Sequence, residues 1–259
     1  MKHSLKNILG YTIETTDGMK GKVKDFLFDE DKWIVRYIDA DFGSFFKDKR
    51  ILLPANVLID PLWDSKHFPL NITKEDIDKS PTPEDKSTVS REYEKELMKY
   101  YGYATYWSSG YIPHTHTAMY YPARPLNVPT KKVSEEKIIE EKLDTKLRSF
   151  SEVKGYHILA QDGNLGHVED MIADDSDWQL IYLIVDTSNW RPWSKKVILL
   201  INWLEKISYE TREVSIDVHT DIIKDAPEFD TSKPVDQAFE EALSDYYQRA
   251  FPSEKNSNP

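Results

Sequence analysis

The chain has 259 residues, a formal net charge of −11 and a hydrophobic fraction of 39%. This length fits two domains of ordinary size, and the composition is that of a globular protein, not a disordered one. The acidic balance argues against strong nucleic-acid binding, which depends on clustered lysine and arginine side chains. Cysteine is absent, which excludes disulfide and thiolate chemistry and agrees with a reducing compartment.

Membrane insertion is also disfavoured. The longest apolar runs, such as residues 197–201, are far shorter than the roughly 20 residues that span a bilayer. Residues 1–4 lead into the first folded segment without a signal-peptide core. We therefore expect a cytoplasmic protein without a transmembrane segment, for which peripheral association with a membrane stays open.

The sequence contains two related copies of one unit. The first begins at Gly10-Tyr11 and the second at Gly155-Tyr156. A constant spacing relates the matched pairs Asp25/Asp170, Asp29/Asp174, Trp33/Trp178, Tyr37/Tyr182 and Asp41/Asp186. After a one-residue insertion in the second copy, the match resumes at Leu53/Leu199, Asn56/Asn202, Leu58/Leu204, Ile77/Ile223 and Pro81/Pro227 and ends at Tyr100-Tyr101/Tyr246-Tyr247. A duplicated residue is a poor candidate for a unique catalytic group.

Each copy reads as a series of short strands. Asp17-Gly18 and Asp162-Gly163 predict hairpin turns, because glycine accepts the positive φ that such turns need. Strands are predicted at 21–29, 33–41, 51–53 and 68–72 in the first copy, and at 178–186, 197–201 and 213–218 in the second. Close turn signals between short strands predict a small antiparallel barrel or sandwich in each copy.

A helix is predicted to close each copy. Thr73 with Asp76 three residues later resembles a capping box that begins a helical turn. Apolar residues then follow at helical spacing, Val89, Tyr93, Leu97 and Tyr100 in the first copy and Val235, Phe239, Leu243 and Tyr246 in the second. We interpret this stripe as the face that packs on the strands.

The ordered series resembles the PRC-barrel family, which is named for the cytoplasmic domain of the photosynthetic reaction-centre H subunit. The residues that carry the resemblance are 10–11, 21–25 and 33–37 in the first copy, and 166–170, 178–186, 189–190, 195–200 and 213–218 in the second. The resemblance implies a mainly β fold with some α-helix: two small antiparallel PRC-type β-barrels, each followed by an amphipathic helix.

The resemblance also bears on function. The family has no established catalytic residues, and its members look like partner-binding modules. One relative supports electron and proton delivery to quinone, and another is the barrel of a ribosome-maturation factor that binds a ribosomal protein. This sequence lacks the N-terminal membrane helix of the first and the RNA-processing domain of the second, so it looks like the stand-alone tandem proteins of the family.

Polar residues give few catalytic candidates. The repeated acids Asp25/Asp170 and Asp41/Asp186 are interpreted as structural carboxylates that accept hydrogen bonds from nearby backbone groups, with acid–base catalysis as the less favoured alternative. His114 and His116 would share one face of a strand, which is half of a metal site at most. We assign no catalytic, metal or cofactor site and expect no enzyme activity.

The segment between the copies is rich in aromatic residues. It includes six candidate residues for a partner or oligomer surface, Tyr103, Tyr106, Trp107, Tyr111, Tyr120 and Tyr121. Such a segment is too apolar for a flexible linker, and prolines such as Pro113 and Pro122 interrupt any helix there. Two interpretations stay open: the rings pack within the protein or against a second copy, or they bind a partner, because Tyr and Trp dominate interface hot spots.

These observations lead to one organisation. Residues 1–101 form the first repeat with its closing helix, 102–145 an aromatic and charged arm, 146–251 the second repeat with its helix, and 252–259 a disordered tail. The expected function is a non-catalytic protein-binding scaffold or adaptor that forms a homo-oligomer and binds no cofactor. The alternatives are a peripheral subunit of a membrane electron-transfer complex and a factor associated with ribosomes or RNA maturation.

Overall fold

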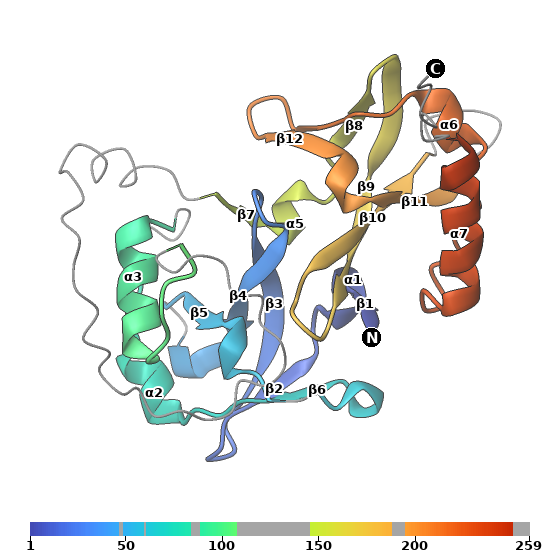
Figure 1. Ribbon diagram of the computed structural model, residues 1–259. Helices are drawn as coiled ribbons and strands as arrows, with labels where there is room; N and C mark the ends of the chain where they lie inside the picture. The colour runs from blue at the N-terminus through green and yellow to red at the C-terminus, as the bar shows by residue number, and fades with distance from the viewer. Residues whose placement is uncertain (47–48, 60, 84–88, 108–145, 188–194, 251–259) are drawn as a thin grey trace, which may run out of the picture. The chain divides into compact units, whose positions relative to one another are not determined.

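The computed structural model is mainly β with several helices, and its strands form two sheets (Figure 1). It describes residues 1–46, 49–59, 61–83, 89–107, 146–187 and 195–250. The chain divides into two compact units. The N-terminal unit contains Ile8–Arg148 and Ser176–Trp178, and the C-terminal unit contains Met1–Asn7, Ser149–Asp175 and Gln179–Pro259.

The sheet of the N-terminal unit has the strand order β5-β4-β3-β2-β6, with β7 paired to β3. Its strands are β2 (Thr12–Glu14), β3 (Lys20–Asp29), β4 (Ile34–Asp41), β5 (Ile51–Pro54), β6 (His67–Pro69) and β7 (Leu147–Ser149). Its helices are α2 (Lys74–Lys79) and α3 (Arg91–Tyr100), with short 3-10 turns η1 (Gly43–Phe46), η2 (Ala55–Val57) and η3 (Trp63–Ser65). The strands predicted for the first copy are all present.

The sheet of the C-terminal unit repeats this plan in the order β11-β10-β9-β8-β13-β12, with β1 paired to β9. Its strands are β1 (Lys2–Ser4), β8 (His157–Ala160), β9 (Gly163–Asp174), β10 (Leu180–Asp186), β11 (Lys196–Leu200), β12 (Leu204–Ser208) and β13 (Glu213–Ile216). Its helices are α5 (Phe150–Val153), α6 (Thr220–Lys224) and α7 (Gln237–Ala250), with the 3-10 turn η4 (Ile201–Trp203); α1 (Leu5–Ile8) follows β1.

The sequence predicted purely antiparallel sheets, but each sheet contains one parallel pair of strands. β2 pairs with β6 in parallel, with Ile13 opposite Phe68. β8 pairs in the same way with β13, with Ile158 opposite Val214. The remaining strand pairs with a described register, such as β3 with β4 and β9 with β10, are antiparallel. Short apolar strands look alike in either direction, so the sequence did not reveal the parallel pairs.

Each sheet takes its added strand from the other copy of the repeat. β1 precedes the first copy but pairs with β9 of the second, with His3 opposite Ala173. β7 precedes the second copy but pairs with β3 of the first. The boundaries of the compact units therefore depart from the sequence repeat at the start of each copy. Neither short strand has the length or alternation that would have predicted it.

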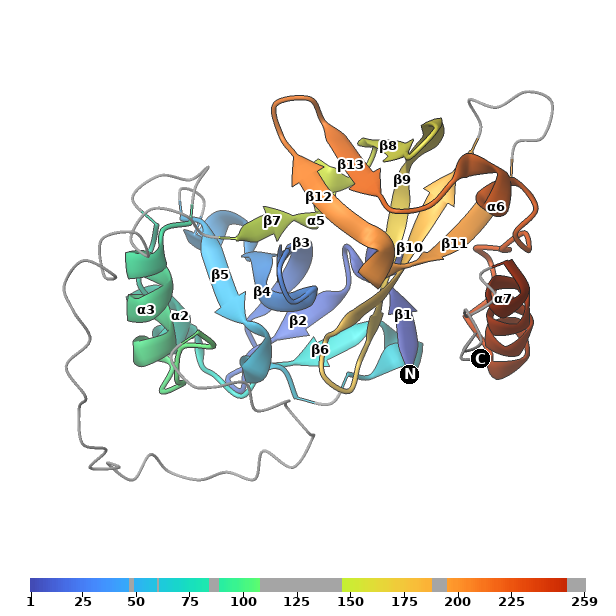
Figure 2. The same cartoon turned by 45° about the horizontal axis from the view of Figure 1, so that its top comes forward.

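The predicted apolar stripe packs on the sheet in the N-terminal unit except at its last position, whereas in the C-terminal unit only one of its four residues, Leu243, is buried. In the N-terminal unit Tyr93 and Leu97 of α3 and the preceding Val89 join one core cluster with Leu27 and Tyr37. The last stripe residue, Tyr100, is exposed instead. Figures 1 and 2 show α3 beside β5. The capping box at α2 is present, because Thr73 and Asp76 bond to each other's backbone amides.

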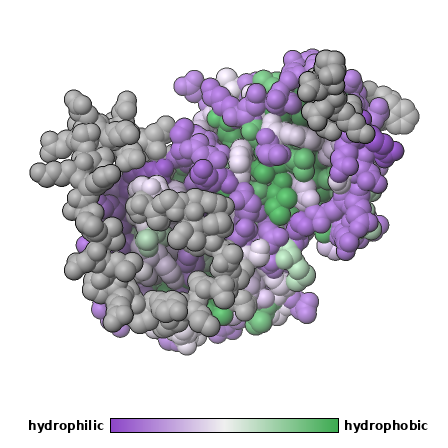
Figure 3. All heavy atoms as spheres, viewed as in Figure 1, coloured by the Kyte–Doolittle hydropathy of each residue, from purple (hydrophilic) through white to green (hydrophobic). Residues whose placement is uncertain are grey.

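In the C-terminal unit α7 is less deeply buried than α3. Leu243 and Tyr247 are its buried residues, so Tyr247 takes the buried place that the apolar stripe predicted for Tyr246. The Tyr247 hydroxyl donates a hydrogen bond of 2.6 Å to the Ile198 carbonyl of β11, which fixes the helix beside that strand. The outward face of α7 is hydrophilic (Figure 3). Among the described residues, no helix is long and apolar enough to cross a membrane.

Candidate functional site

A buried acid lies where the closing helix of the N-terminal unit meets the sheet. Glu94 on α3 has a side chain that is 0% exposed. The Tyr37 hydroxyl on β4 donates a hydrogen bond to Oε2 of Glu94 at 3.1 Å. A buried carboxyl group is unusual, because removal from water disfavours its charged form unless partners compensate.

Two further groups complete the surroundings of Glu94. The Tyr106 hydroxyl donates to Oε2 at 2.9 Å, and the Arg91 guanidinium lies 3.3 Å from Oε1. Arg91 also donates to the Tyr106 hydroxyl at 2.7 Å. Arg91, Tyr106 and Glu94 therefore form a closed triangle of hydrogen bonds, with Tyr37 as a third donor to the acid.

Burial dominates the protonation of this acid. Desolvation raises the pKa of Glu94 to about 7, although the Arg91 charge and the hydrogen bonds from Tyr106 and Tyr37 oppose the shift. The nearby Asp29 charge raises it further. Burial, followed by the Glu94 charge, likewise raises the pKa of both tyrosines, so each stays a hydrogen-bond donor at neutral pH. Glu94 thus changes charge within the physiological range.

A second arginine flanks the same tyrosine. Arg36 lies with its guanidinium carbon 4.0 Å from the centroid of the Tyr106 ring and pairs with Asp29 at 3.3 Å. Arg91 stacks over the neighbouring Trp107 at 4.4 Å. Cations over aromatic faces are stabilising, particularly where water is excluded. The two arginines hold the aromatic pair against the unit.

A tight turn at the end of α3 reverses the chain and places Tyr106 and Trp107 beside this helix. Gly102 follows α3 with φ of 76°, which suits glycine. Its amide donates to the Lys99 carbonyl, and the Tyr103 amide donates to the Met98 carbonyl. This pair of bonds is a Schellman motif, which reverses the chain at a helix end. Residues 103–107, called here the docked segment, therefore lie against the unit that α3 covers.

The structure places three of the six residues proposed as an interaction surface. Tyr103, Tyr106 and Trp107 are each half-buried on the N-terminal unit, and the Tyr103 hydroxyl donates to the Asn56 carbonyl at 3.0 Å. The other three lie outside the described residues: Tyr111, Tyr120 and Tyr121. For the first three, intramolecular packing is present, and each residue is left partly exposed.

The tyrosine–glutamate pair recurs in the C-terminal unit. The Tyr182 hydroxyl on β10 donates to Oε1 of Glu240 on α7 at 2.5 Å. Lys2 on β1 donates to Oε2 at 2.7 Å. The Glu240 side chain is 26% exposed, whereas that of Glu94 is fully buried. The pair is thus common to both units, and only the N-terminal one is sealed by the docked segment.

The repeated acids have structural partners. Asp170 accepts hydrogen bonds from the amides of Lys6 and Met171 and from the Ser4 hydroxyl, which ties α1 and β1 to β9. Asp25 accepts from the Phe26 amide. Asp41 accepts from the Gly43 amide at 2.7 Å. These contacts support the structural interpretation, although Asp25 and Asp170 lie inside strands, not at their ends.

Within the part of the chain that the structure describes, two groups of side chains have the spacing of cation ligands, and both lie on the C-terminal unit. They are His167, Glu169 and Asp186, and the exposed Asp162, His219 and Asp221. Lys196 lies 3.0 Å from Glu169, and Lys6 also pairs with it. These ammonium groups already neutralise the acid that a metal would need. His114 and His116 lie outside the described residues.

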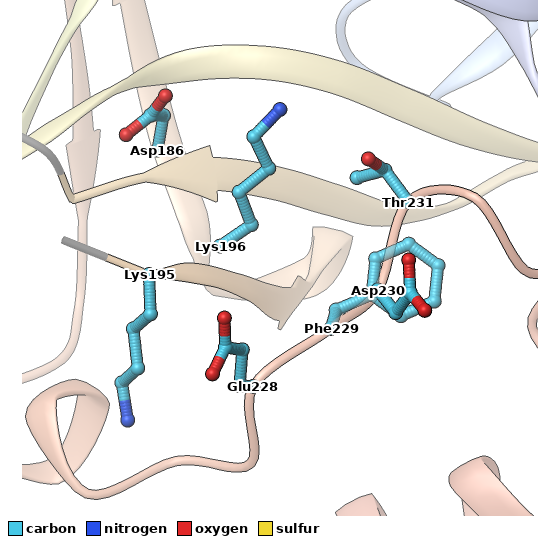
Figure 4. Close-up of a pocket in the computed structure, with 7 residues that line it drawn as sticks. All are labelled: Asp186, Lys195, Lys196, Glu228, Phe229, Asp230 and Thr231. Carbon is cyan, nitrogen blue, oxygen red and sulfur yellow. The ribbon is translucent and has the colours of Figure 1, made fainter.

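An open depression lies beside the first of these groups (Figure 4). It is lined by Asp186, Lys195, Lys196, Glu228, Phe229, Asp230 and Thr231. Lys195 and Lys196 are neighbours on the chain and point in opposite directions. The Lys195 ammonium donates to the Ala226 carbonyl at 2.6 Å, and that of Lys196 pairs with Glu169. Both lysines are therefore engaged by the protein, and the depression offers little for an anion.

Comparison with known families agrees with the architecture of the N-terminal part of the chain. Residues 2–67 match the PRC-barrel domain. The matched PRC-barrel residues run from β1 through β2, β3, β4 and β5 to the start of β6. They therefore include β1, the strand that pairs with β9. No curated protein matches the chain.

Sequence analysis did not single out the two glutamates. Glu94 and Glu240 are separated by the same interval as Tyr93 and Phe239 of the helical stripe. That shared interval was the available signal, since an acid repeated within an amphipathic stripe lies next to the buried face. The repeat does not distinguish the buried Glu94 from the more exposed Glu240. Tyr106, which contacts Glu94, belongs to a segment that follows the repeat.

Proposed function

We propose that the protein is a non-catalytic PRC-barrel protein that acts as a protein-binding scaffold or adaptor. In this proposal both units are PRC-type barrels, so the protein is a tandem member related to the reaction-centre H-subunit domain. Support for the second barrel comes from its strand order, which repeats that of the first sheet, and from the shared tyrosine–glutamate pair. The protein works in the cytoplasm as a homo-oligomer and needs no cofactor.

The observation that carries the proposal is the aromatic–arginine surface at α3. Tyr106 and Trp107 meet edge to face with ring centroids 4.7 Å apart. Arg91 lies over Trp107, and both aromatic residues are only partly buried. Tryptophan, tyrosine and arginine are the residue types that dominate protein–protein hot spots. A rigid, preorganised set of these side chains favours binding, because little side-chain entropy is lost.

Capture from the native host tests this function. The tagged full-length protein is crosslinked mildly in cells, purified and examined for co-purifying molecules by mass spectrometry. We expect a stoichiometric protein partner with the natural chain and its loss with Trp107→Ala. Leu62→Ala is the matched control, since Leu62 is an exposed apolar residue of the same unit, and it should keep the partner.

The identity of the captured molecules separates the rival functions. Components of a membrane electron-transfer complex would replace the adaptor assignment by a peripheral-subunit one. Ribosomal particles or RNA, bound with a steep dependence on salt, would replace it by a ribosome-associated one. Turnover of a substrate by the purified protein, abolished by single changes that leave it folded, would refute the non-catalytic assignment.

A further inference from the structure

The docked segment contacts the buried acid of α3 through Tyr106. Glu94 is fully buried, and the Tyr106 hydroxyl lies 2.9 Å from its Oε2. Tyr106 is itself held by the guanidinium of Arg36 and by a 2.7 Å hydrogen bond from Arg91. In the described part of the C-terminal unit, the equivalent Glu240 bonds to Tyr182 and Lys2 and is 26% exposed. In the N-terminal unit, contact with Tyr106 accompanies the full burial of Glu94.

We propose that residues 103–107 form a proton-responsive latch, which is held on the N-terminal unit while Glu94 is neutral and is released when Glu94 ionises. The latch is a property of the chain alone and holds whether or not the segment binds a partner. Release would free Tyr106 and Trp107 from the arginines and let water reach the carboxylate.

The charged and titratable groups around Glu94 determine how strongly the closed segment favours the neutral acid. They are Tyr37 and Arg36 from β4, Arg91 from α3, Asp29 from β3 and Tyr106 from the docked segment. Arg91 and the two hydroxyl donors favour the charged acid, whereas burial and Asp29 favour the neutral one. Burial is the largest contribution, so the closed latch binds a proton more tightly than an open one would.

Linkage gives the direction and size of the effect. The closed state has a pKa of about 7 at Glu94, and an opened, hydrated acid would return toward its ordinary value of 4.5. Between these two pKa values Glu94 is ionised in the open state and still protonated in the closed state, so a rise in pH favours the open state. Between pH 6 and pH 8 the equilibrium for closing should fall about tenfold.

Amide hydrogen exchange of the full-length protein, read by mass spectrometry on peptides covering residues 101–107, tests the latch. After correction for the chemical exchange rate, protection in the natural chain is expected to fall about tenfold from pH 6 to pH 8. Glu94→Gln cannot ionise and should show no such fall. Glu240→Gln is the matched control and should keep it. Equal protection of the natural chain at both pH values, or the same fall in Glu94→Gln, would overturn the proposal.

A second variant keeps the test decisive if Glu94→Gln does not fold. Tyr106→Phe retains the ring that covers Glu94 and removes one hydrogen bond that favours its charged form. The latch then predicts a fall in protection at least as large as in the natural chain. A clearly smaller fall would contradict a role for burial by this ring.

Discussion

The Tyr37 hydroxyl donates a hydrogen bond to Glu94 across the contact between strand β4 and helix α3. The same bond recurs between Tyr182 of β10 and Glu240 of α7. In both units it fixes the closing helix to the matching strand of the sheet. The pair differs only in its surroundings, since the first acid is sealed and the second is partly exposed and bound to Lys2.

The first prediction concerns the pH dependence of stability. The pKa of Glu94 in the folded protein is raised to about 7 from 4.5, so its neutral form stabilises the fold fully below pH 4.5. This stability is lost as the pH rises through 7, to a total of about 3 kcal/mol. Glu94→Gln should remove that loss. Urea unfolding of the natural protein and of Glu94→Gln at pH 5 and pH 8 measures this loss in the free energy of unfolding. The same loss in both proteins would contradict the prediction.

The second prediction concerns the turn that returns the docked segment. Gly102 has φ of 76°, and an alanine there would be strained although its side chain meets no atom within 4 Å. Gly102→Ala should therefore destabilise the closed segment by about 1 kcal/mol. Hydrogen exchange of residues 101–107 at pH 6 should accelerate by about fivefold, with β8 unaffected. Unchanged exchange in both regions would show that the turn does not hold the segment.

The third prediction concerns two matched glycines at which one strand approaches another. A Cβ on Gly166 would lie 2.2 Å from the Asp186 carbonyl oxygen, and one on Gly21 would lie 2.8 Å from that of Asp41. Gly166→Ala should lower the free energy of unfolding by about 3 kcal/mol, and Gly21→Ala by less. Lys22→Ala, at an exposed position on β3, is the control. If denaturant unfolding shows that Lys22→Ala loses as much free energy of unfolding as either glycine variant, the steric argument is refuted.

The fourth prediction concerns the strand that the C-terminal unit takes from the start of the chain. Deletion of residues 1–7 removes β1, the buried Leu5 and two of the hydrogen-bond partners of Asp170, Ser4 and Lys6. The loss of one buried leucine alone costs about 3 kcal/mol. Hydrogen exchange should accelerate in β9 while β4 keeps its protection. Loss of protection in β4 with β9 intact would show that β1 belongs with the first copy.

The sequence could predict most strands, because turn residues and β-branched runs are local signals. Asp17-Gly18 predicted its hairpin, and Thr73 predicted the start of α2. It could not predict the exchange of β1 and β7 or the parallel β2–β6 pair, since three-residue strands carry no pattern that names their partner. These pairings depend on contacts between distant parts of the chain.

The site was predictable only in part. The density of aromatic residues indicated a packed or partner-binding segment, and Tyr106 and Trp107 belong to it. Glu94 was missed, because a glutamate in a charged helix normally lies in water. Its burial follows from Tyr106 and the chain reversal at Gly102, which are tertiary features. The distinction between the two units therefore lies outside the repeat.

The proposed function requires that the docked segment, with Trp107, forms a protein-binding surface. The most direct measurement is a calorimetric titration of the captured partner into the natural protein, Trp107→Ala and the control Leu62→Ala. If Trp107 is a hot spot, its loss should weaken binding by about 30-fold or more, while the control binds within about twofold of the natural protein. Equal affinity of Trp107→Ala and the natural protein would contradict the claim.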